Sequence, residues 1–240
     1  MAFSILSREF DHHTERVHAA GGSWVRDVML GLNDGLVASF AVTSGVAGAF
    51  VTGNAAMMAG LSEMLGGAVA MGLAAFISAR SQIEFYQSEI EREREEIRRW
   101  PEREREEISA IYKLKGFAGP LLDQIVAHIT SDPDRWSNVM MREELGFNAE
   151  SFESPGRSAL AVGLSYLAGA AVPVWAYIFF EPREALRVSA ISTVVVLFAV
   201  GALKTIITSR SWWRSGLESM FVGVAAAGAT YIAGRMFAAR

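Results

Sequence analysis

The 240-residue chain contains no cysteine, and charged residues are scarce outside one internal segment. The absence of cysteine excludes disulfide bonds, thiolate metal sites and a cysteine nucleophile. Residues 80–156 hold 17 of the 26 acidic residues and 11 of the 22 Lys and Arg residues, so the flanking regions are mainly apolar. This distribution argues against an ordinary soluble enzyme, a nucleic-acid-binding protein and a disordered chain.

Long apolar runs occupy the regions that lack charge. A helix of about 20 apolar residues crosses the hydrocarbon core of a bilayer. Five segments reach or approach this length, and before any extension they contain only two charged residues, Asp34 and Glu63. The segments are residues 28–50, 54–79, 158–180, 188–203 with an extension to 209, and 219–234 with a start near 216. The sequence therefore predicts an all-α integral membrane protein with five transmembrane helices.

The charge pattern also predicts the organisation of the chain. We expect an N-terminal tail (1–27), transmembrane helices 1 and 2 (28–79), an acidic helical domain (80–156) and transmembrane helices 3 to 5 (157–240). The polar stretch 10–22 does not resemble a signal peptide, so we expect the first span to be retained. Cytoplasmic loops are enriched in Lys and Arg. A cytoplasmic N-terminus places 18 of these bases inside and 4 outside, which makes the tail and the acidic domain cytoplasmic.

Turn and break signals subdivide these regions. Residues 51–54 form a tight turn between the first two spans, and helical composition continues from the second span to Arg99. Pro101 interrupts that helix and opens the next one. Three shorter helices are expected in the acidic domain, at residues 102–114, 121–130 and 133–145. Pro173, inside the third span, is expected to kink it.

Two spans carry acidic side chains at membrane depth, where a charged carboxylate is costly unless it is neutral, paired or hydrated. Asp27 lies seven residues before Asp34 and shares its helix face, and Met71 lies eight residues after Glu63, close enough to border one lumen. Carboxylates with thioethers suit a borderline divalent metal better than Mg²⁺ or Ca²⁺. The alternatives are packing for the methionine, a structural hydrogen bond for Asp34, and an ion pair between Lys204 and either intramembrane acid.

Glycines are dense in the spans, and Gly31 and Gly35 form a pair that allows helices to approach closely. One interpretation is packing within a single chain. The other is a homodimer with a transport pathway between the subunits, because five helices are few for enclosing a path.

Carboxylates recur at helical spacing in the acidic domain. Glu93 and Glu96 lie three residues apart on one helix, and Glu104 and Glu107 on the next, so each pair points to one side. Helices joined by a proline break are able to bring the four groups together. Like charges at this spacing require a counter-ion, which is either arginine or a metal. Arginines at 91–107 therefore leave a solvated, salt-bridged helix as the alternative.

Other candidate ligands are more dispersed. Met140, Met141 and Glu144 lie on the last helix of the acidic domain. Glu15 and His18 form a single Glu-x-x-His pair, whereas a di-iron carboxylate oxidase needs two such pairs and two further Glu residues. A membrane di-iron oxidase and a metal-sensing scaffold without flux are the two alternatives to transport. The tail also contains His12 and His13, which either help to capture metal or are simply solvated.

Several of these motifs together resemble the vacuolar iron transporter family. The first span contains Arg26-Asp27-x6-Asp34-Gly35-Leu36, followed by Phe40-Ala41-Val42 and Gly45-Val46-Ala47-Gly48-Ala49. The second contains Gly60-Leu61-Ser62-Glu63-Met64, Ala70-Met71-Gly72 and Ala79-Arg80-Ser81, and the last runs from Gly216-Leu217-Glu218 to Gly234-Arg235. The likeness extends from about Arg26 to Arg235.

The resemblance implies a five-span homodimer, without enzymatic activity or a tightly bound cofactor, that exports Fe²⁺ from the cytosol by proton antiport along the dimer interface. It also implies Mn²⁺, Co²⁺ or Zn²⁺ as further cargo. Asp34 and Met71 match metal-contact positions of the pathway, and Asp27 and Glu63 match supporting acidic positions. The acidic domain matches a metal-binding module, whose ligands are Glu93, Glu96, Glu104, Glu107, Met140, Met141 and Glu144. The short, His-bearing tail is more similar to bacterial members, so we expect a bacterial plasma membrane.

Overall fold

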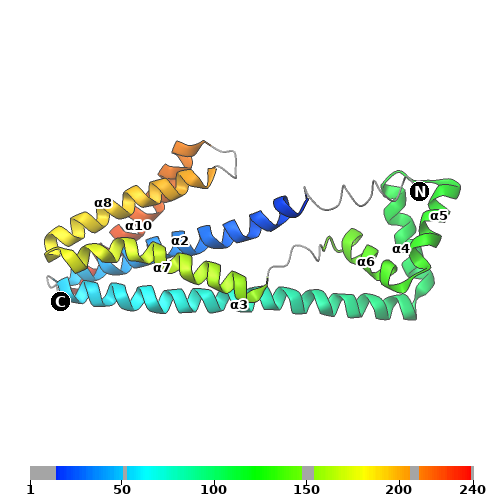
Figure 1. The fold of residues 1–240 in the computed structure, drawn as a ribbon, viewed down its shortest axis with the longest axis horizontal. Coiled ribbons are helices and arrows are strands. Elements are labelled where there is room, and N and C mark those ends of the chain that lie inside the picture. Colours follow the sequence, from blue (N-terminus) through cyan, green and yellow to red (C-terminus); the bar gives the residue numbers. More distant parts are fainter. Residues whose placement is uncertain (1–14, 51–52, 148–153, 206–210, 239–240) are drawn as a thin grey trace. The chain divides into compact units, whose positions relative to one another are not determined.

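The computed structural model describes residues 15–50, 53–147, 154–205 and 211–238. Regular secondary structure in these residues is entirely helical (Figure 1), which confirms the predicted fold class. The helices are α2 (Glu15–Ala49), α3 (Gly53–Arg99), α4 (Pro101–Leu114), α5 (Gly119–Thr130), α6 (Pro133–Glu143), α7 (Pro155–Phe179), α8 (Pro182–Leu203) and α10 (Trp212–Ala238).

Five helices, α2, α3, α7, α8 and α10, are long and apolar enough to cross a membrane, as the sequence predicted. The chain forms two compact units. The first, here called the span unit, comprises residues 1–77 and 153–240, and the second, the acidic unit, comprises residues 78–152. The predicted turn at 51–54 and the extension of the fourth span to 209 fall partly outside the described residues.

The helix starts follow the proline positions. Prolines stand in the first turn of five helices, where the missing N–H group costs nothing and the fixed φ favours the helix; they are Pro101, Pro120, Pro133, Pro155 and Pro182. The side chain of Asp132 caps α6 by accepting a hydrogen bond of 2.8 Å from the backbone N–H of Arg135. The predicted interruption of α3 before Pro101 is confirmed.

The span helices begin earlier than the apolar segments predicted. α2 starts at Glu15 instead of residue 28, α8 at Pro182 instead of 188, and α10 at Trp212 instead of 219. The difference has a physical reason. Apolar content marks the part of a helix that suits a bilayer, whereas the helix itself continues until a proline, a cap or a turn ends it.

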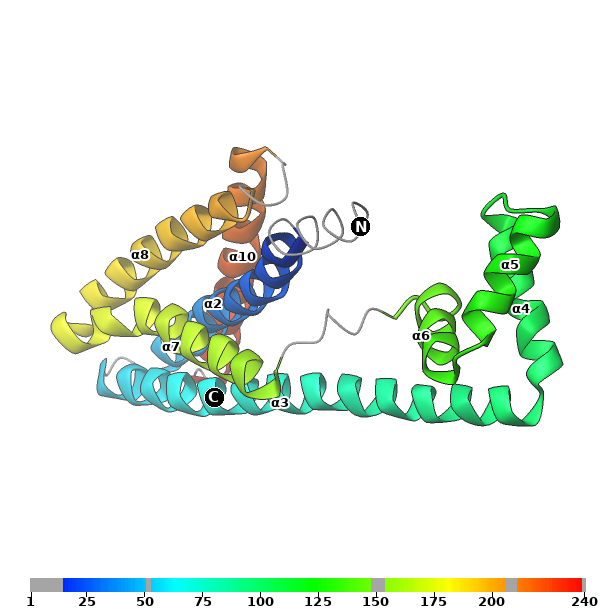
Figure 2. The ribbon, with the colours of Figure 1, turned by 45° about the vertical axis from the view of Figure 1, so that its right-hand side comes forward.

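Close backbone approaches hold the span unit together. They lie where α2 packs against α7 and α10, the helices drawn beside it in Figure 2. A side chain added at Gly31 would collide with Ser165 and Val162, and one at Gly35 with the backbone of Tyr166 on α7. On its other side, α2 meets α10, where Gly234 packs against the backbone of α2. Gly31 and Gly35 therefore serve packing within one chain, the first of the two predicted interpretations.

The acidic unit has a small apolar core of its own. Ile97 of α3 packs with residues of all three shorter helices, namely Ile108, Ile129, Trp136 and Met140. The last turns of α3 are therefore tied to α4, α5 and α6. This arrangement positions the acidic side chains on α3 and α4.

Candidate metal and transport sites

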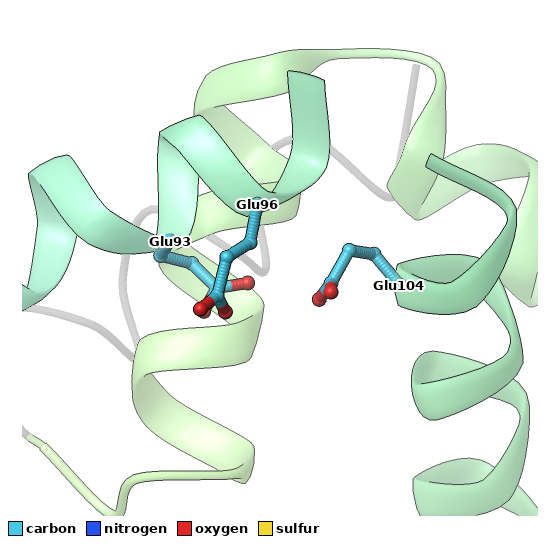
Figure 3. Close-up of side chains that lie close together, drawn as sticks. All are labelled: Glu93, Glu96 and Glu104. Atoms are coloured by element: carbon cyan, nitrogen blue, oxygen red, sulfur yellow. The ribbon is translucent and has the colours of Figure 1, made fainter. Parts of the chain in front are cut away.

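Three predicted carboxylates converge in the acidic unit. Glu93 and Glu96 project from the last turns of α3, and Glu104 projects from the first turn of α4. One oxygen from each lies within 4.8 Å of the other two, and Figure 3 shows the carboxylates directed toward one another. The spacing of three residues places the first two on one face, and the chain reversal before Pro101 turns Glu104 toward them.

Two members of this carboxylate cluster (Glu93, Glu96 and Glu104) are almost fully buried. Glu93 is 5% exposed and Glu104 is 2% exposed. One carboxylate oxygen of each, Oε1 of Glu93 and Oε2 of Glu104, is buried and has no hydrogen-bond partner among the described residues. A buried anionic oxygen without a partner is costly, so these groups have unused capacity to bind a cation.

The surroundings of the cluster disfavour its negative charge. Burial, together with Glu104, Glu144, Glu96 and Glu107, raises the pKa of Glu93 to about 7. Burial is also the main reason why the pKa values of Glu104 and Glu144 are raised, and neighbouring carboxylates add to both shifts. The excess of negative charge is what a divalent cation would neutralise.

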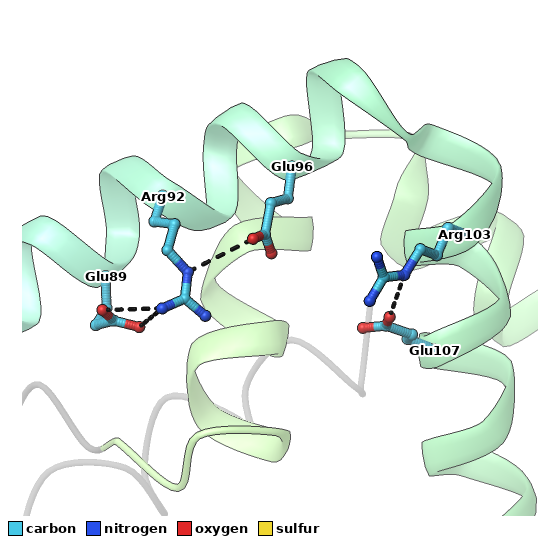
Figure 4. A network of polar contacts seen from close by, with 5 residues as sticks. All are labelled: Glu89, Arg92, Glu96, Arg103 and Glu107. Carbon is cyan, nitrogen blue, oxygen red and sulfur yellow. Dashed lines mark hydrogen bonds and ion pairs between the residues drawn. The ribbon is translucent and has the colours of Figure 1, made fainter.

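Arginines neutralise only the margin of this region (Figure 4). Arg92 pairs with Glu89 at 3.1 Å and with Glu96 at 3.5 Å, and Arg103 pairs with Glu107 at 3.2 Å. The alternative of a solvated, salt-bridged helix therefore holds for Glu107 and for one carboxylate oxygen of Glu96. Within the described part of the chain, no ion pair involves the two buried carboxylates, Glu93 and Glu104.

The remaining ligands expected in the acidic unit lie differently. Met140 is fully buried in the apolar core, and Met141 is 1% exposed. Packing accounts for Met140, and no described contact joins either sulfur to the carboxylate cluster. Glu144 is exposed but acts electrostatically on Glu93. The ligand roles of these three residues remain predictions.

In the span unit, Asp34 is exposed on the single chain. It lines a pocket of about 620 Å³ between α2, the end of α8 and the start of α10. Glu218 lines the same pocket, as does Lys204, the residue predicted to pair with Asp34 or Glu63.

Glu63 and Met71, expected to border one lumen, are both associated with the packing around Tyr166. The Tyr166 hydroxyl donates a hydrogen bond to Oε1 of Glu63, whereas Oε2 is buried without a partner among the described groups. Met71 packs beside the cluster formed by Ala68, Tyr166 and Ala170. Neither the sequence pattern nor the spacing pointed to Tyr166, because its partner lies 103 residues away.

Asp27 is 3% exposed and strongly bonded. It accepts a hydrogen bond from the Ser158 hydroxyl at 2.5 Å and pairs with Arg26 at 3.1 Å. Ser158 is a second site residue that sequence reasoning missed. The candidates His12 and His13 lie outside the described residues, as do the side chains of Glu15 and His18.

The comparisons with known proteins agree with this architecture. The VIT family model matches residues 25–235. Vacuolar iron transporter 1 of Oryza sativa subsp. japonica is 33% identical over 232 residues, which cover 96% of this chain and 92% of that protein. Vacuolar iron transporter 1 of Arabidopsis thaliana is 32% identical over 222 residues, covering 92% and 88%. Protein CCC1 of Saccharomyces cerevisiae is 28% identical over 219 residues, covering 86% and 67%. This multi-pass membrane chain therefore belongs to the VIT family, as its sequence motifs indicated.

Proposed function

We propose that this protein exports Fe²⁺ from the cytosol by proton antiport, along a pathway shared by two copies of the chain. The two plant relatives are named as iron transporters, which supports transport of iron and not catalysis. The observation that carries the metal assignment is the carboxylate cluster, because two of its buried oxygens have no hydrogen-bond partner in the part of the chain that the structure describes. Mn²⁺, Co²⁺ and Zn²⁺ are further candidate cargo, since they accept the same oxygen ligands.

We assign capture of the cytosolic metal to the carboxylate cluster. Each Glu contributes a hard oxygen ligand, and the raised pKa of Glu93 means that metal competes with a proton at this site near neutral pH. Met140, Met141, Glu107 and Glu144 belong to the proposed ligand set through the family resemblance. A divalent ion replaces the mutual repulsion of these carboxylates with attraction, which stabilises both the ion and the acidic unit.

The transport pathway is assigned to Asp27, Asp34, Glu63 and Met71. Asp34 is exposed on the single chain, and a charged side chain that faces lipid at this depth costs several kcal/mol. A second copy covering this surface would remove that cost and supply a second carboxylate to the same metal. This supports a homodimer with the pathway at its interface.

Proton coupling follows from the chemistry of these carboxylates. A deprotonated carboxylate binds a divalent metal, and a protonated one releases it. Protons that arrive from the side opposite the cytosol therefore displace the metal, and loss of the protons to the cytosol restores the site. The excess of Lys and Arg on the expected cytoplasmic side supports this orientation. A bacterial plasma membrane remains our proposal for the location, and membrane fractionation of the source cells tests it.

The decisive test is flux in proteoliposomes that contain the full chain and a pH-sensitive dye. We expect Fe²⁺ movement with opposite proton movement, and loss of both in Asp34→Ala. Normal flux in this variant would reject the pathway. Oxygen consumption that depends on Fe²⁺ would favour the oxidase alternative, and metal binding without flux would favour a sensor.

A paired test addresses the capture site. We expect Glu104→Gln to weaken metal binding and to raise the metal concentration needed for half-maximal flux. Glu102→Gln is the matched control, because Glu102 is an exposed acid on the same helix turn outside the cluster. Equal binding by both variants would remove the capture role.

A further inference from the structure

A group of buried hydroxyls lies between α2, α7 and α8 in the span unit. Its members, here called the hydroxyl cluster, are all at most 6% exposed; they are Ser39, Thr43, Tyr177, Ser189 and Thr193. None of them belongs to the metal sites described above. Polar groups at bilayer depth need partners inside the protein, because lipid offers none.

Only two members find such partners in the described residues. Thr43 donates to the backbone carbonyl of Ser39 at 2.8 Å, and Ser189 donates to the carbonyl of Pro173 at 2.8 Å. The side-chain oxygens of Ser39, Tyr177 and Thr193 are buried and have no hydrogen-bond partner among the described groups. Each unsatisfied hydroxyl carries an energetic penalty.

The packing brings these hydroxyls to two adjacent levels. Leu36 of α2 packs with Leu197 of α8, and these helices run in opposite directions along the chain path. From this contact, an antiparallel register places Ser39, one turn after Leu36, at the level of Thr193, one turn before Leu197. One turn beyond that, the same register places Thr43 at the level of Ser189. Thr43 and Ser189 are also the polar groups beside the Tyr177 hydroxyl.

Pro173 increases the polarity of this region. As a residue inside α7, it has no N–H group to donate to the carbonyl one turn earlier, at Gly169. Its own carbonyl already accepts a hydrogen bond from Ser189. Ser189 thus connects the hydroxyl cluster to the part of α7 where regular helical hydrogen bonding is interrupted.

The hydroxyl cluster leads toward Glu63. A Cβ added to Gly60 of α3 would press on the Thr43 methyl group, so these two residues are in contact. Glu63 lies three residues further along α3, which is less than one helical turn. Its Oε2 is buried and has no described partner, and the titratable groups that act on it are Tyr166 and Asp34.

We propose that ordered water molecules occupy the hydroxyl cluster and conduct protons to Glu63 from the end of the spans at which α2 ends and α3 begins. Water supplies the missing partners, since a buried water molecule makes two to four hydrogen bonds to polar groups. When a proton binds at one end of the chain of hydroxyls and water molecules, each oxygen accepts one proton and passes another to the next oxygen, so one O–H bond forms and one breaks at every step. The last proton forms a bond to Oε2 of Glu63, so no other reactant is required.

The water itself is tested independently of transport by radiolytic hydroxyl labelling of the full chain in detergent. Radicals formed from bound water oxidise the side chains next to it, so we expect labelling of the buried Tyr177 ring. The Ser189→Ala, Thr193→Val double variant should reduce this labelling. An unlabelled Tyr177 in the wild type, or unchanged labelling in the double variant, would overturn the proposal.

The proton path rests on the proposed antiport and is tested with Co²⁺ in proteoliposomes. We expect Thr193→Val and Ser39→Ala to slow net Co²⁺ flux driven by a pH gradient by about tenfold, the effect of one lost hydrogen bond on the barrier. Exchange of Co²⁺ for Co²⁺ at equal pH should be unchanged, because it requires no net proton movement. Thr193→Val nearly preserves the volume of the side chain. Ser39→Ala is a separate second variant, so the test still stands if one of the two proteins fails to fold.

Thr230→Val is the matched control. Its hydroxyl is on α10 and already donates to the backbone carbonyl of Ala41 at 2.7 Å, outside the hydroxyl cluster. Its pH-driven flux should equal that of the wild type. A wild type that moves no protons refutes the antiport itself, whereas normal coupling in both cluster variants refutes only this proton path.

Discussion

Replacement of Glu93 by glutamine should have opposite effects on the metal-free and metal-bound protein. In the metal-free chain, burial and neighbouring carboxylates raise the pKa of Glu93 from 4.5 to about 7. At pH 8 the group is ionised in the folded and unfolded states, and the folded state bears the cost of that charge. This cost is at most about 3 kcal/mol, because one pKa unit corresponds to 1.36 kcal/mol. Solvent penetration reduces it, so Glu93→Gln should stabilise the metal-free acidic unit by about 1–3 kcal/mol.

The same pKa shift fixes the sign of the pH dependence. The folded state binds the proton more tightly than the unfolded state, so the wild type gains stability as the pH falls through about 7 toward 4.5. The advantage of Glu93→Gln over the wild type should therefore be largest at pH 8 and should shrink at pH 5. With saturating metal the order reverses, because the variant lacks one ligand.

Hydrogen–deuterium exchange of the full chain in detergent measures these effects locally. At pH 8 without metal, peptides from residues 91–107 should exchange about tenfold more slowly in Glu93→Gln for each 1.4 kcal/mol of stabilisation. Mn²⁺ at about 100 times its dissociation constant should protect the wild type by about 2.7 kcal/mol and the variant much less. Glu102→Gln should match the wild type in both conditions. Faster exchange of metal-free Glu93→Gln, or equal Mn²⁺ protection of wild type and variant, would refute the reasoning.

Further substitutions test other contacts. Tyr166→Phe removes the hydroxyl that donates to Glu63 and should lower stability by about 1–3 kcal/mol in thermal unfolding; an unchanged midpoint would exclude a structural role for that bond. Gly35→Ala presses a methyl group onto the α7 backbone and should cost at least about 1–3 kcal/mol, whereas Gly228→Ala meets open space and should not destabilise. Asp132→Ala should fray the first turn of α6, seen as faster amide exchange there, and intact protection would show that the cap is dispensable.

The sequence was sufficient for features that depend on local composition. Apolar length predicted five spans, and proline positions predicted the start of α4 and α6. The three-residue spacing of Glu93 and Glu96, combined with the break before Pro101, predicted a meeting with Glu104 that the structure shows. These inferences succeeded because each rests on neighbours within a few helical turns.

Contacts between helices that are distant in the chain could not be predicted from the sequence. Tyr166 and Ser158 reach Glu63 and Asp27 from 103 and 131 residues away, and no spacing rule links such positions in one sequence. Met140 illustrates a different difficulty. A thioether near carboxylates in the sequence looks the same whether it faces a metal or an apolar core, and here it packs in the core.

The contacts of α2 restrict which parts of the span unit are able to move during a transport cycle. At Gly35 it touches the backbone of α7, and Gly234 of α10 touches the backbone of α2 from the other side. At these points backbone meets backbone, with no side chain between them whose rotamer would absorb sliding, so these three helices behave as a fixed frame. α3 approaches the backbone of α7 at Gly72, opposite Ala159 and Gly163. At Gly60 and Gly67 it meets the frame through side chains instead, namely those of Thr43, Val174 and Tyr166. The part of α3 that includes Gly60, Glu63 and Gly67 therefore has more freedom to shift against the frame than α2, α7 and α10 have relative to one another, and such a shift would alternate the exposure of the metal path.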